Sequence, residues 1–227
     1  MPSTKKTLHF MSCALATAVS VGILGFGMST SWAETSMLCE TNGTAHIRLE
    51  LFNGFLTRIS CPLFGGVDNF EVTSTLSVTG NAPLILHILV VFFLALCMVC
   101  SAGSILIALY NSVSNPYETY MGPIGIYVCS SISACLSVLV LILFPINVSV
   151  TSMAEDLVAT MVSAKPGEVD LREKSSEMMM GYFLVIPYTV LSLVAIALIY
   201  AYDHAAYTQR KEQQRPTEDA PKEIMMY

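Results

Sequence analysis

The sequence predicts a mainly α-helical membrane protein, namely a four-transmembrane-helix bundle with a small disulfide-closed, β-like first extracellular loop. Only 12% of the residues are charged and 54% are hydrophobic, whereas a soluble domain usually carries about 25% charged residues. From Val72 to Ala154 the chain has one charged side chain, that of Glu118. Because a charge at the centre of a bilayer costs roughly 2.5–3.5 kcal/mol, lipid is the environment that excludes charge over such lengths.

Four apolar blocks are long enough to cross a bilayer, since a span needs about 20 apolar residues for a hydrocarbon core of ~30 Å. We expect these spans at about residues 8–33, 83–110, 122–148 and 181–202. The segments between and after them are two extracellular loops, 34–82 and 149–180, and a disordered tail, 203–227. The chain is therefore expected to be a single membrane domain.

The placement of basic residues predicts which side of the membrane each segment occupies. Basic residues next to span ends tend to stay in the cytoplasm. Two lysines precede the first block, and Arg210, Lys211 and Arg215 follow the fourth. Both groups of basic residues lie in the cytoplasm if the chain has an even number of spans and both termini are cytoplasmic. The two large loops are therefore expected outside.

The first apolar block has two interpretations. Ser31-Trp32-Ala33 before Glu34 fits the cleavage site of a secretory signal, which would remove the block. The 26 uncharged residues from Leu8 exceed the usual apolar length of a signal, and Trp32 fits an anchor at the membrane interface. We favour a retained span, with the cleaved signal as the alternative.

Small residues at four-residue spacing mark faces where helices in lipid can pack closely. One ridge consists of Ala14, Ala18 and Gly22, and a second of Cys129, Ser133 and Ser137. We expect these ridges to pack the helices within the chain, with a homo-oligomer as the alternative.

The first outer loop is expected to form a small sheet. It contains Cys39 and Cys61, and two cysteines in one oxidising loop most simply form a disulfide. Strand-like alternation occurs in His46–Phe52, Leu56–Cys61 and Phe70–Val78, with breaks at Asn53-Gly54 and Gly65-Gly66.

Two further features concern the loops. Asn42-Gly43-Thr44 is a glycosylation acceptor on the expected outer side, whereas Asn147-Val148-Ser149 lies too close to the third span for ready access. In the second loop, a capping box at Ser152–Glu155 predicts a short helix. Its apolar side would carry Met153, Leu157 and Met161.

The sequence contains no pattern of an enzyme or of a cofactor or metal site. Its four histidines are scattered, and no phosphate loop or nucleophile elbow is present. The net charge of −6 gives no basic patch for nucleic acid. We therefore expect no catalytic residue, no metal and no cofactor, and the lipid bilayer as the first partner.

The chain ends in Ile224-Met225-Met226-Tyr227. Hydrophobic side chains at Met225 and Tyr227 could add a strand to the groove of a PDZ domain, with the terminal carboxylate held by backbone amides. An unbound end is the alternative.

Three stretches of the sequence have the pattern of a known family: Asn115-Pro116-Tyr117-Glu118-Thr119 with Gly122-Pro123-Ile124-Gly125-Ile126-Tyr127, Leu51-Phe52-Asn53-Gly54 with Arg58 and Cys61, and Leu38-Cys39-Glu40-Thr41. These stretches resemble the clarin family, within the wider superfamily of claudin and peripheral-myelin-protein-like four-span proteins. We interpret Gly122, Pro123, Gly125 and Tyr127 as a structural turn motif at the start of the third helix, because glycine and proline set turns and first helical positions.

The resemblance implies an organiser or adaptor that links plasma-membrane assemblies to cytoplasmic scaffold proteins and actin, as in the sensory cells of hearing and vision. A claudin-like junction or paracellular barrier component is one alternative, although Phe52 stands where claudins have tryptophan. An auxiliary subunit of an ion channel is another.

Overall fold

The computed structural model describes residues 4–39, 43–61, 65–79, 81–113, 122–162 and 171–213. The elements in these residues are α1 (Thr4–Met28), β1 (Ala33–Cys39), β2 (Thr44–Leu49), β3 (Asn53–Ile59), β4 (Gly66–Glu71), α2 (Val72–Thr79), α3 (Asn81–Val113), α4 (Pro123–Ser149), α5 (Met153–Val162), β5 (Leu171–Met178), α6 (Met180–Phe183) and α7 (Val185–Gln213).

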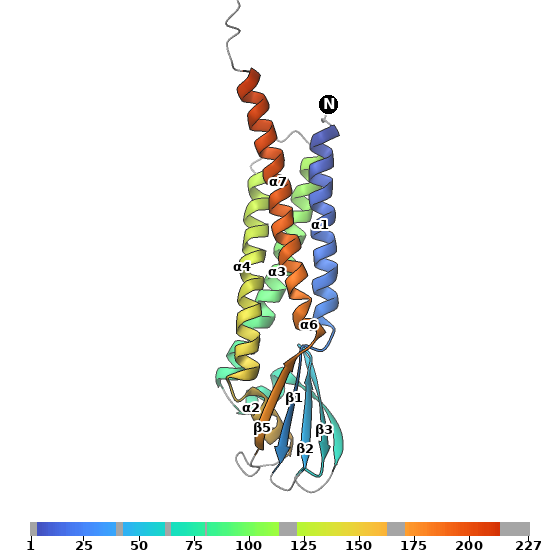
Figure 1. Cartoon of the computed structure of the whole chain (residues 1–227), viewed down its shortest axis with the longest axis vertical. Coiled ribbons are helices and arrows are strands. Elements are labelled where there is room, and N and C mark those ends of the chain that lie inside the picture. Colours follow the sequence, from blue (N-terminus) through green and yellow to red (C-terminus); the bar gives the residue numbers. More distant parts are fainter. Residues whose placement is uncertain are drawn as a thin grey trace, which may run out of the picture.

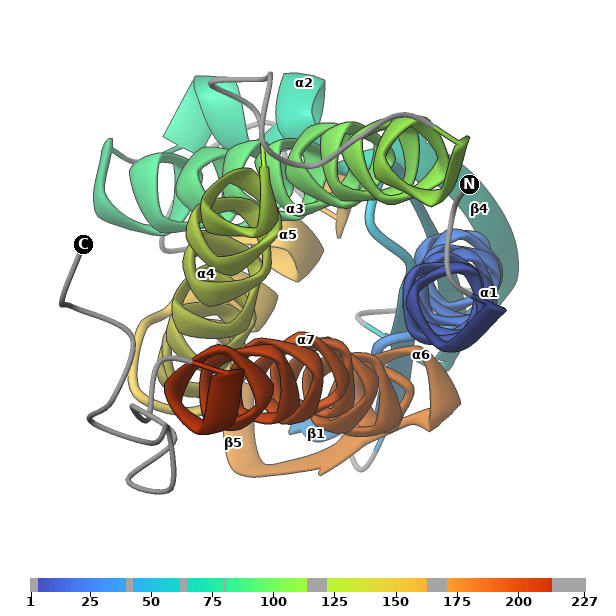
Figure 2. The ribbon, with the colours of Figure 1, turned by 90° about the horizontal axis from the view of Figure 1, so that it is seen from above.

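Four long helices, α1, α3, α4 and α7, stand side by side as a bundle above a sheet (Figure 1). They form a ring in the order α1–α3–α4–α7, in which each helix contacts its two neighbours (Figure 2). Each contributes an apolar stretch long enough to cross a bilayer, and the stretches are Lys6–Met28, Ala82–Val113, Pro123–Ser149 and Met180–Ala205. The chain is a multi-pass membrane protein, and the predicted four-helix class is confirmed.

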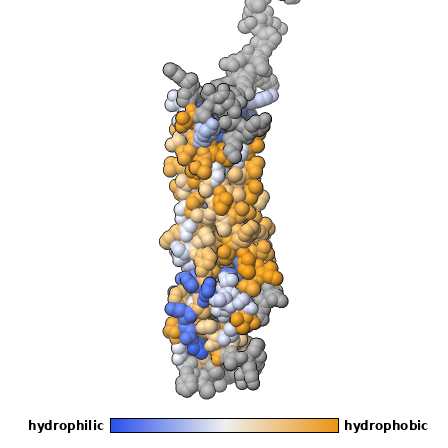
Figure 3. Space-filling model, turned by 180° about the vertical axis from the view of Figure 1, so that it is seen from behind, coloured by the Kyte–Doolittle hydropathy of each residue, from blue (hydrophilic) through white to orange (hydrophobic). Residues whose placement is uncertain are grey.

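On the face seen in Figure 3, hydrophobic residues dominate the bundle and hydrophilic residues gather at the sheet, and large hydrophobic side chains are exposed on all four long helices. An apolar exterior is stable only in contact with lipid, so the bundle is the part within the bilayer. The sheet and the tail of α7 therefore project from opposite sides, which are called the sheet side and the tail side below.

The sheet has five antiparallel strands in the order β4-β3-β2-β1-β5. Strand β5 comes from the segment before the last span and pairs with β1, so that Glu34 lies opposite Glu177 and Leu38 opposite Arg172. Two loops that are far apart in the sequence thus build one sheet. The sheet predicted for the first loop is confirmed, but the participation of β1 and β5 was not expected.

One predicted strand is wrong. Phe70–Val78 alternates like a strand, yet β4 ends at Glu71 and α2 follows it. Val72 and Leu76, four residues apart, are both fully buried, which is the spacing of one helical face. The Thr75 hydroxyl donates to the Glu71 carbonyl at 2.8 Å, so a local hydrogen bond supports the first helical turn.

Two short helices, α2 and α5, cover one face of the sheet. They contact each other, and α2 contacts β4 while α5 contacts β2. In α5, Met153 and Leu157 are buried and Met161 packs against the same core, as the sequence predicts. This arrangement leaves the opposite face of the sheet uncovered by the described residues.

Trp32 joins the bundle to the sheet. Its side chain is fully buried, and its indole Nε1–H donates to the Gly27 carbonyl at 2.8 Å. Its amide donates to Leu49 of β2, and its carbonyl accepts from the Met179 amide beside β5. The ring packs edge-on against Phe144 of α4, with centroids 5.0 Å apart. The expectation that Trp32 is an interfacial anchor is wrong, because the chain turns inward after Met28 instead of following the membrane surface.

Gly181 in α6 allows this close packing. A Cβ atom on Gly181 would lie 2.6 Å from Trp32 Cδ1, 2.7 Å from Trp32 Nε1 and 2.9 Å from the Gly27 carbonyl oxygen. Real Cβ contacts are longer, so any side chain at this position would displace the indole. Glycine is therefore required here for space and not for an unusual backbone conformation.

Replacing Gly181 with alanine is expected to destabilise the protein. Overpacking of this kind typically costs about 1–3 kcal/mol, which would lower Tm by roughly 2–4 °C per kcal/mol in a chain of this size. Gly22→Ala is the matched control, because nothing lies within 4 Å of a Cβ there. Thermal unfolding in detergent measures both variants. An unchanged Tm for Gly181→Ala would contradict the tight packing of the indole.

Candidate functional site

The uncovered face of the sheet carries a group of exposed apolar side chains. Phe55, Ile59 and Val67 are 37%, 58% and 69% exposed, respectively. Thr57 lies between Phe55 and Ile59 on β3 and pairs with Val67 on β4, so all three apolar side chains point to the same face. We call Phe55, Ile59 and Val67 the sheet patch. Exposed apolar groups of this kind are common where proteins bind partners.

Polar side chains of β1 and β2 border the sheet patch. Arg48 lies opposite Phe55, and His46 lies opposite Thr57. Arg48 forms an ion pair with Glu34 at 3.4 Å, with both side chains largely in solvent. An exposed pair contributes little to stability, so its charges remain available to select a partner.

A disulfide closes the end of the sheet that is far from the bundle. Cys39 at the end of β1 bonds to Cys61 after β3, with Cα atoms 5.7 Å apart, and both cysteines are buried. Because β2 lies between β1 and β3, the bond ties three strands together. The predicted pairing is confirmed.

The two glycosylation motifs differ in the structure. Asn42 lies outside the described residues. Asn147 is fully buried, its side-chain amide donates to the Pro83 carbonyl at 3.2 Å, and its Oδ1 accepts from the Thr151 hydroxyl at 3.1 Å. An oligosaccharide on Asn147 is incompatible with this fold, in agreement with the poor access expected from the sequence.

The Gly-Pro-x-Gly-x-Tyr motif connects three helices on the tail side of the bundle. Gly122 precedes α4 and Pro123 is its first residue. A Cβ on Gly125 would lie 3.0 Å from Ile107 Cδ1 of α3, so the glycine brings the two helices close together. Tyr127 donates its hydroxyl to Asp203 Oδ2 of α7 at 3.0 Å.

Hydroxyl groups form a network in the centre of the bundle. Tyr188 of α7 donates to the Cys97 carbonyl of α3 at 3.2 Å, and its oxygen lies 2.8 Å from Ser101 Oγ. Thr189 Oγ1 lies 2.8 Å from Ser137 Oγ of α4, and Ser133 is also buried. Buried hydrogen bonds of this type connect helices in lipid. Among the described residues, no group of three potential ligands could hold a metal ion.

The first small-residue ridge is only partly inside the bundle. Ala14 is buried, but Ala18 and Gly22 are exposed, and nothing lies within 4 Å of a Cβ on Gly22. The expectation that these two residues pack within the chain is wrong. The buried face of α1 instead contains Phe10, Cys13, Ala14, Thr17, Ser20 and Leu24. The buried face differs from the predicted ridge because α1 packs against both α3 and α7.

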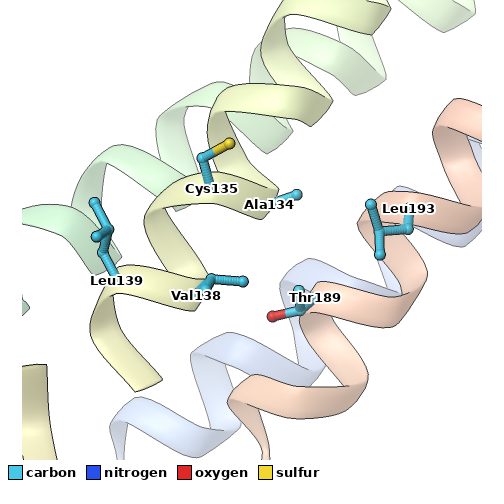
Figure 4. A pocket seen from close by; sticks show the side chains of 6 residues that line it. All are labelled: Ala134, Cys135, Val138, Leu139, Thr189 and Leu193. Atoms are coloured by element: carbon cyan, nitrogen blue, oxygen red, sulfur yellow. The ribbon is translucent and has the colours of Figure 1, made fainter. Parts of the chain in front are cut away.

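A shallow hollow of about 440 Å³ lies between α4 and α7 (Figure 4). Its lining consists of Ala134, Cys135, Val138, Leu139, Thr189 and Leu193. Several of these side chains also face outward from the bundle, so the hollow opens toward lipid. It offers space for hydrocarbon but no set of groups for chemistry.

The clarin-3 relatives resemble the chain over its whole length. Rat clarin-3 is 32% identical and mouse clarin-3 is 31% identical, and each match covers 100% of both chains. The chain belongs to the clarin family. Human clarin-1 is 26% identical over 69% of this chain and 72% of its own length. No family model matches the chain.

Several residues that organise this clarin are absent from the sequence-based predictions. Gly181, Tyr188 and Asp203 have no motif of their own, because their partners are distant in the chain. The one sequence observation bearing on Asp203 is that it is the first acidic residue after the last span. The candidate PDZ residues Met225 and Tyr227 lie outside the described residues.

Removing the disulfide by Cys39→Ser with Cys61→Ser is expected to destabilise the sheet. The bond closes a loop of 22 residues, for which chain entropy predicts about 3 kcal/mol. Thermal unfolding without reductant measures the loss. Cys135→Ser, a free and exposed cysteine on α4, is the matched control. Equal stability of the double serine variant and the wild type would contradict a structural role for the bond.

The Tyr127–Asp203 hydrogen bond is expected to stabilise the tail side of the bundle. Tyr127→Phe should cost about 1–2 kcal/mol, because the half-buried carboxylate loses its donor. A double-mutant cycle with Asp203→Asn separates the pair from other effects. Tyr200→Phe removes the same group from an exposed side chain of α7 and should change nothing. A coupling energy near zero would exclude the bond as a link between α4 and α7.

Proposed function

We propose that this clarin organises plasma-membrane assemblies by binding partners outside the cell and scaffold proteins inside it, with coupling to actin. The carrying observation is the sheet patch, an uncovered apolar group on a sheet that a disulfide closes. The Trp32 junction fixes this sheet to the bundle, so the patch has a defined orientation relative to the membrane. A rigid surface loses little entropy on binding, which suits recognition.

The disulfide and the basic tail support the proposed orientation in the membrane. A structural disulfide persists in an oxidising compartment, which favours a sheet side outside the cell. The basic residues beyond the last span favour the cytoplasm for both termini. In this orientation the sheet patch faces neighbouring cells or proteins, and α7 extends toward cytoplasmic scaffolds.

The similarity that supports this function covers the whole chain for the clarin-3 relatives, whereas clarin-1 matches 69% of it. The spans contain no acidic, lysine or arginine side chain at mid-depth, which argues against a pump or a coupled transporter. Binding of partners outside and inside the membrane is compatible with such spans.

A junction component is the second candidate, and the acidic residues of the sheet favour it. Glu34, Glu71 and Glu177 lie on β1, β4 and β5 in exposed or half-buried positions. An acidic surface between two cells would attract cations to a paracellular path. This candidate requires that the chain change the resistance of an epithelial layer.

Expression of the tagged chain in polarised epithelial cells separates the two candidates. We expect the wild type to remodel actin-rich protrusions and to leave transepithelial resistance unchanged. Phe55→Ser with Ile59→Ser and Val67→Ser should abolish its clustering at the cell surface while the chain still reaches the membrane. Deletion of residues 214–227 should preserve clustering but remove the effect on actin.

The matched control is Asn53→Ser with Asn69→Ser, which changes exposed polar residues on the same two strands. It should behave like the wild type. Enrichment of the chain at cell contacts together with altered transepithelial resistance would contradict the organiser role and favour the junction component. Normal clustering of the triple serine variant would show that the sheet patch does not bind the partner.

A further inference from the structure

The lipid-facing surface of the bundle has unequal height on its two sides. On α3, exposed apolar side chains repeat at helical spacing from one end to the other, and they include Ile85, Ile88, Phe92, Val99, Leu106, Tyr110 and Val113. The distance from Ile85 to Val113 is about 42 Å at 1.5 Å per residue. On α4 the corresponding stripe runs from Ile124 to Val150, or about 39 Å.

The stripes on the other two helices are shorter. On α1, exposed apolar side chains run from Leu8 to Phe26, about 27 Å. From Met180 in α6 to Tyr200 in α7, before the acidic Asp203, the height is about 30 Å. A hydrocarbon core is ~30 Å thick, so the α1 and α7 side fits a bilayer and the α3 and α4 side exceeds it.

The additional height lies on the sheet side. The helix α1 ends where the chain enters β1, whereas α3 and α4 continue beside the sheet to α2 and α5 (Figure 1). Ile85 and Ile88 of α3 are 55% and 48% exposed there, and Val150 after α4 is 78% exposed. We call Ile85, Ile88 and Val150 the apolar extension.

Tilting of the helices does not remove this excess. Transmembrane helices tilt by about 20° on average, which shortens the α3 stripe only to about 39 Å. A tilt of about 40°, the upper end of the usual range, would be needed to fit 39–42 Å into ~30 Å. The short stripes of α1 and α7 would shrink as well, because the four helices pack as one bundle.

We propose that lipid chains of the sheet-side leaflet cover the apolar extension, so that the protein thickens the bilayer along α3 and α4 and prefers thick membranes. The extension is continuous with the lipid-facing stripes of the same two helices, and no charged residue occurs within α3 or α4. The ion pair of Arg48 with Glu34 lies beside the sheet patch. At the apolar extension, charge comes only after Val150, where Lys174 bonds to the Thr151 carbonyl and to Glu155. The plasma membrane is a few ångströms thicker than the endoplasmic reticulum, so this preference would retain the chain there.

Tryptophan substitutions in vesicles of phosphatidylcholine with brominated acyl chains test the contact directly. Bromine quenches only fluorophores that touch the lipid chains, and the native Trp32 is buried and gives the same background in every variant. We expect Ile85→Trp and Val150→Trp to be quenched as strongly as Phe92→Trp in the middle of the stripe. Phe55→Trp on the sheet patch is the control without lipid contact.

Quenching of Ile85→Trp no greater than that of Phe55→Trp would overturn the proposal. If a second copy covered the extension instead, Ile85→Trp would be shielded from bromine, and cross-linked dimers would persist at high lipid-to-protein ratio. That outcome also overturns it.

A series of phosphatidylcholines with acyl chains of increasing length tests the preference for thickness. Tm of the wild type should be highest in long-chain lipid. Ile85→Asn with Ile88→Asn and Val150→Asn shortens the apolar stripe, so the optimum should shift to shorter chains. The matched variant, Phe55→Asn with Ile59→Asn and Val67→Asn, should keep the wild-type optimum. The same optimum in both variants would refute the preference.

Discussion

The packing of Trp32 against Gly181 is the constraint on which the rest of this clarin depends. The indole lies where α1 ends, where α6 begins and where α4 passes, and the backbone of Trp32 pairs with Leu49 of β2 and with Met179 beside β5. A buried aromatic ring contributes a large apolar area, and its N–H must find an acceptor, which here is the Gly27 carbonyl. One side chain therefore determines both how the helices converge and how the sheet leaves the membrane.

The pairing of β1 with β5 explains why two loops form one unit. The sequence of β5, Leu171–Met178, is rich in charge and has no apolar alternation, so it gains little by forming a strand alone. Beside β1 it supplies hydrogen-bond partners to an edge that would otherwise be free. Lys174 also forms an ion pair with Glu155 of α5 at 2.9 Å, which holds β5 against the helices under the sheet.

The parts of the fold that were predictable are those set by local composition. Each helix must be apolar and must satisfy its own backbone hydrogen bonds to be stable in a bilayer. A block without charge therefore predicts a span without knowledge of its neighbours. The Cys39–Cys61 pair was likewise predictable, since one oxidising loop holds both cysteines. The inner face of α1, the helix α2 and the roles of Trp32 and β5 depend on distant contacts, which local periodicity does not report. Phe70–Val78 is an example: its apolar alternation fits a strand, but the buried pair Val72 and Leu76 fits one face of a helix equally well.

The arrangement of the short helices separates the two surfaces proposed here. Because α2 contacts α3 and α5 contacts α4, the covered face of the sheet lies toward the tall, lipid-rich side of the bundle. The uncovered face with the sheet patch lies on the other side, where β1 and β5 appear beside α7 (Figure 2). Contact with a thickened leaflet therefore leaves the sheet patch free. A bilayer that contacts the bundle along α3 and α4 would hold Phe55, Ile59 and Val67 in a fixed direction. The lipid and a protein partner would then bind different surfaces of the same molecule, so neither would exclude the other.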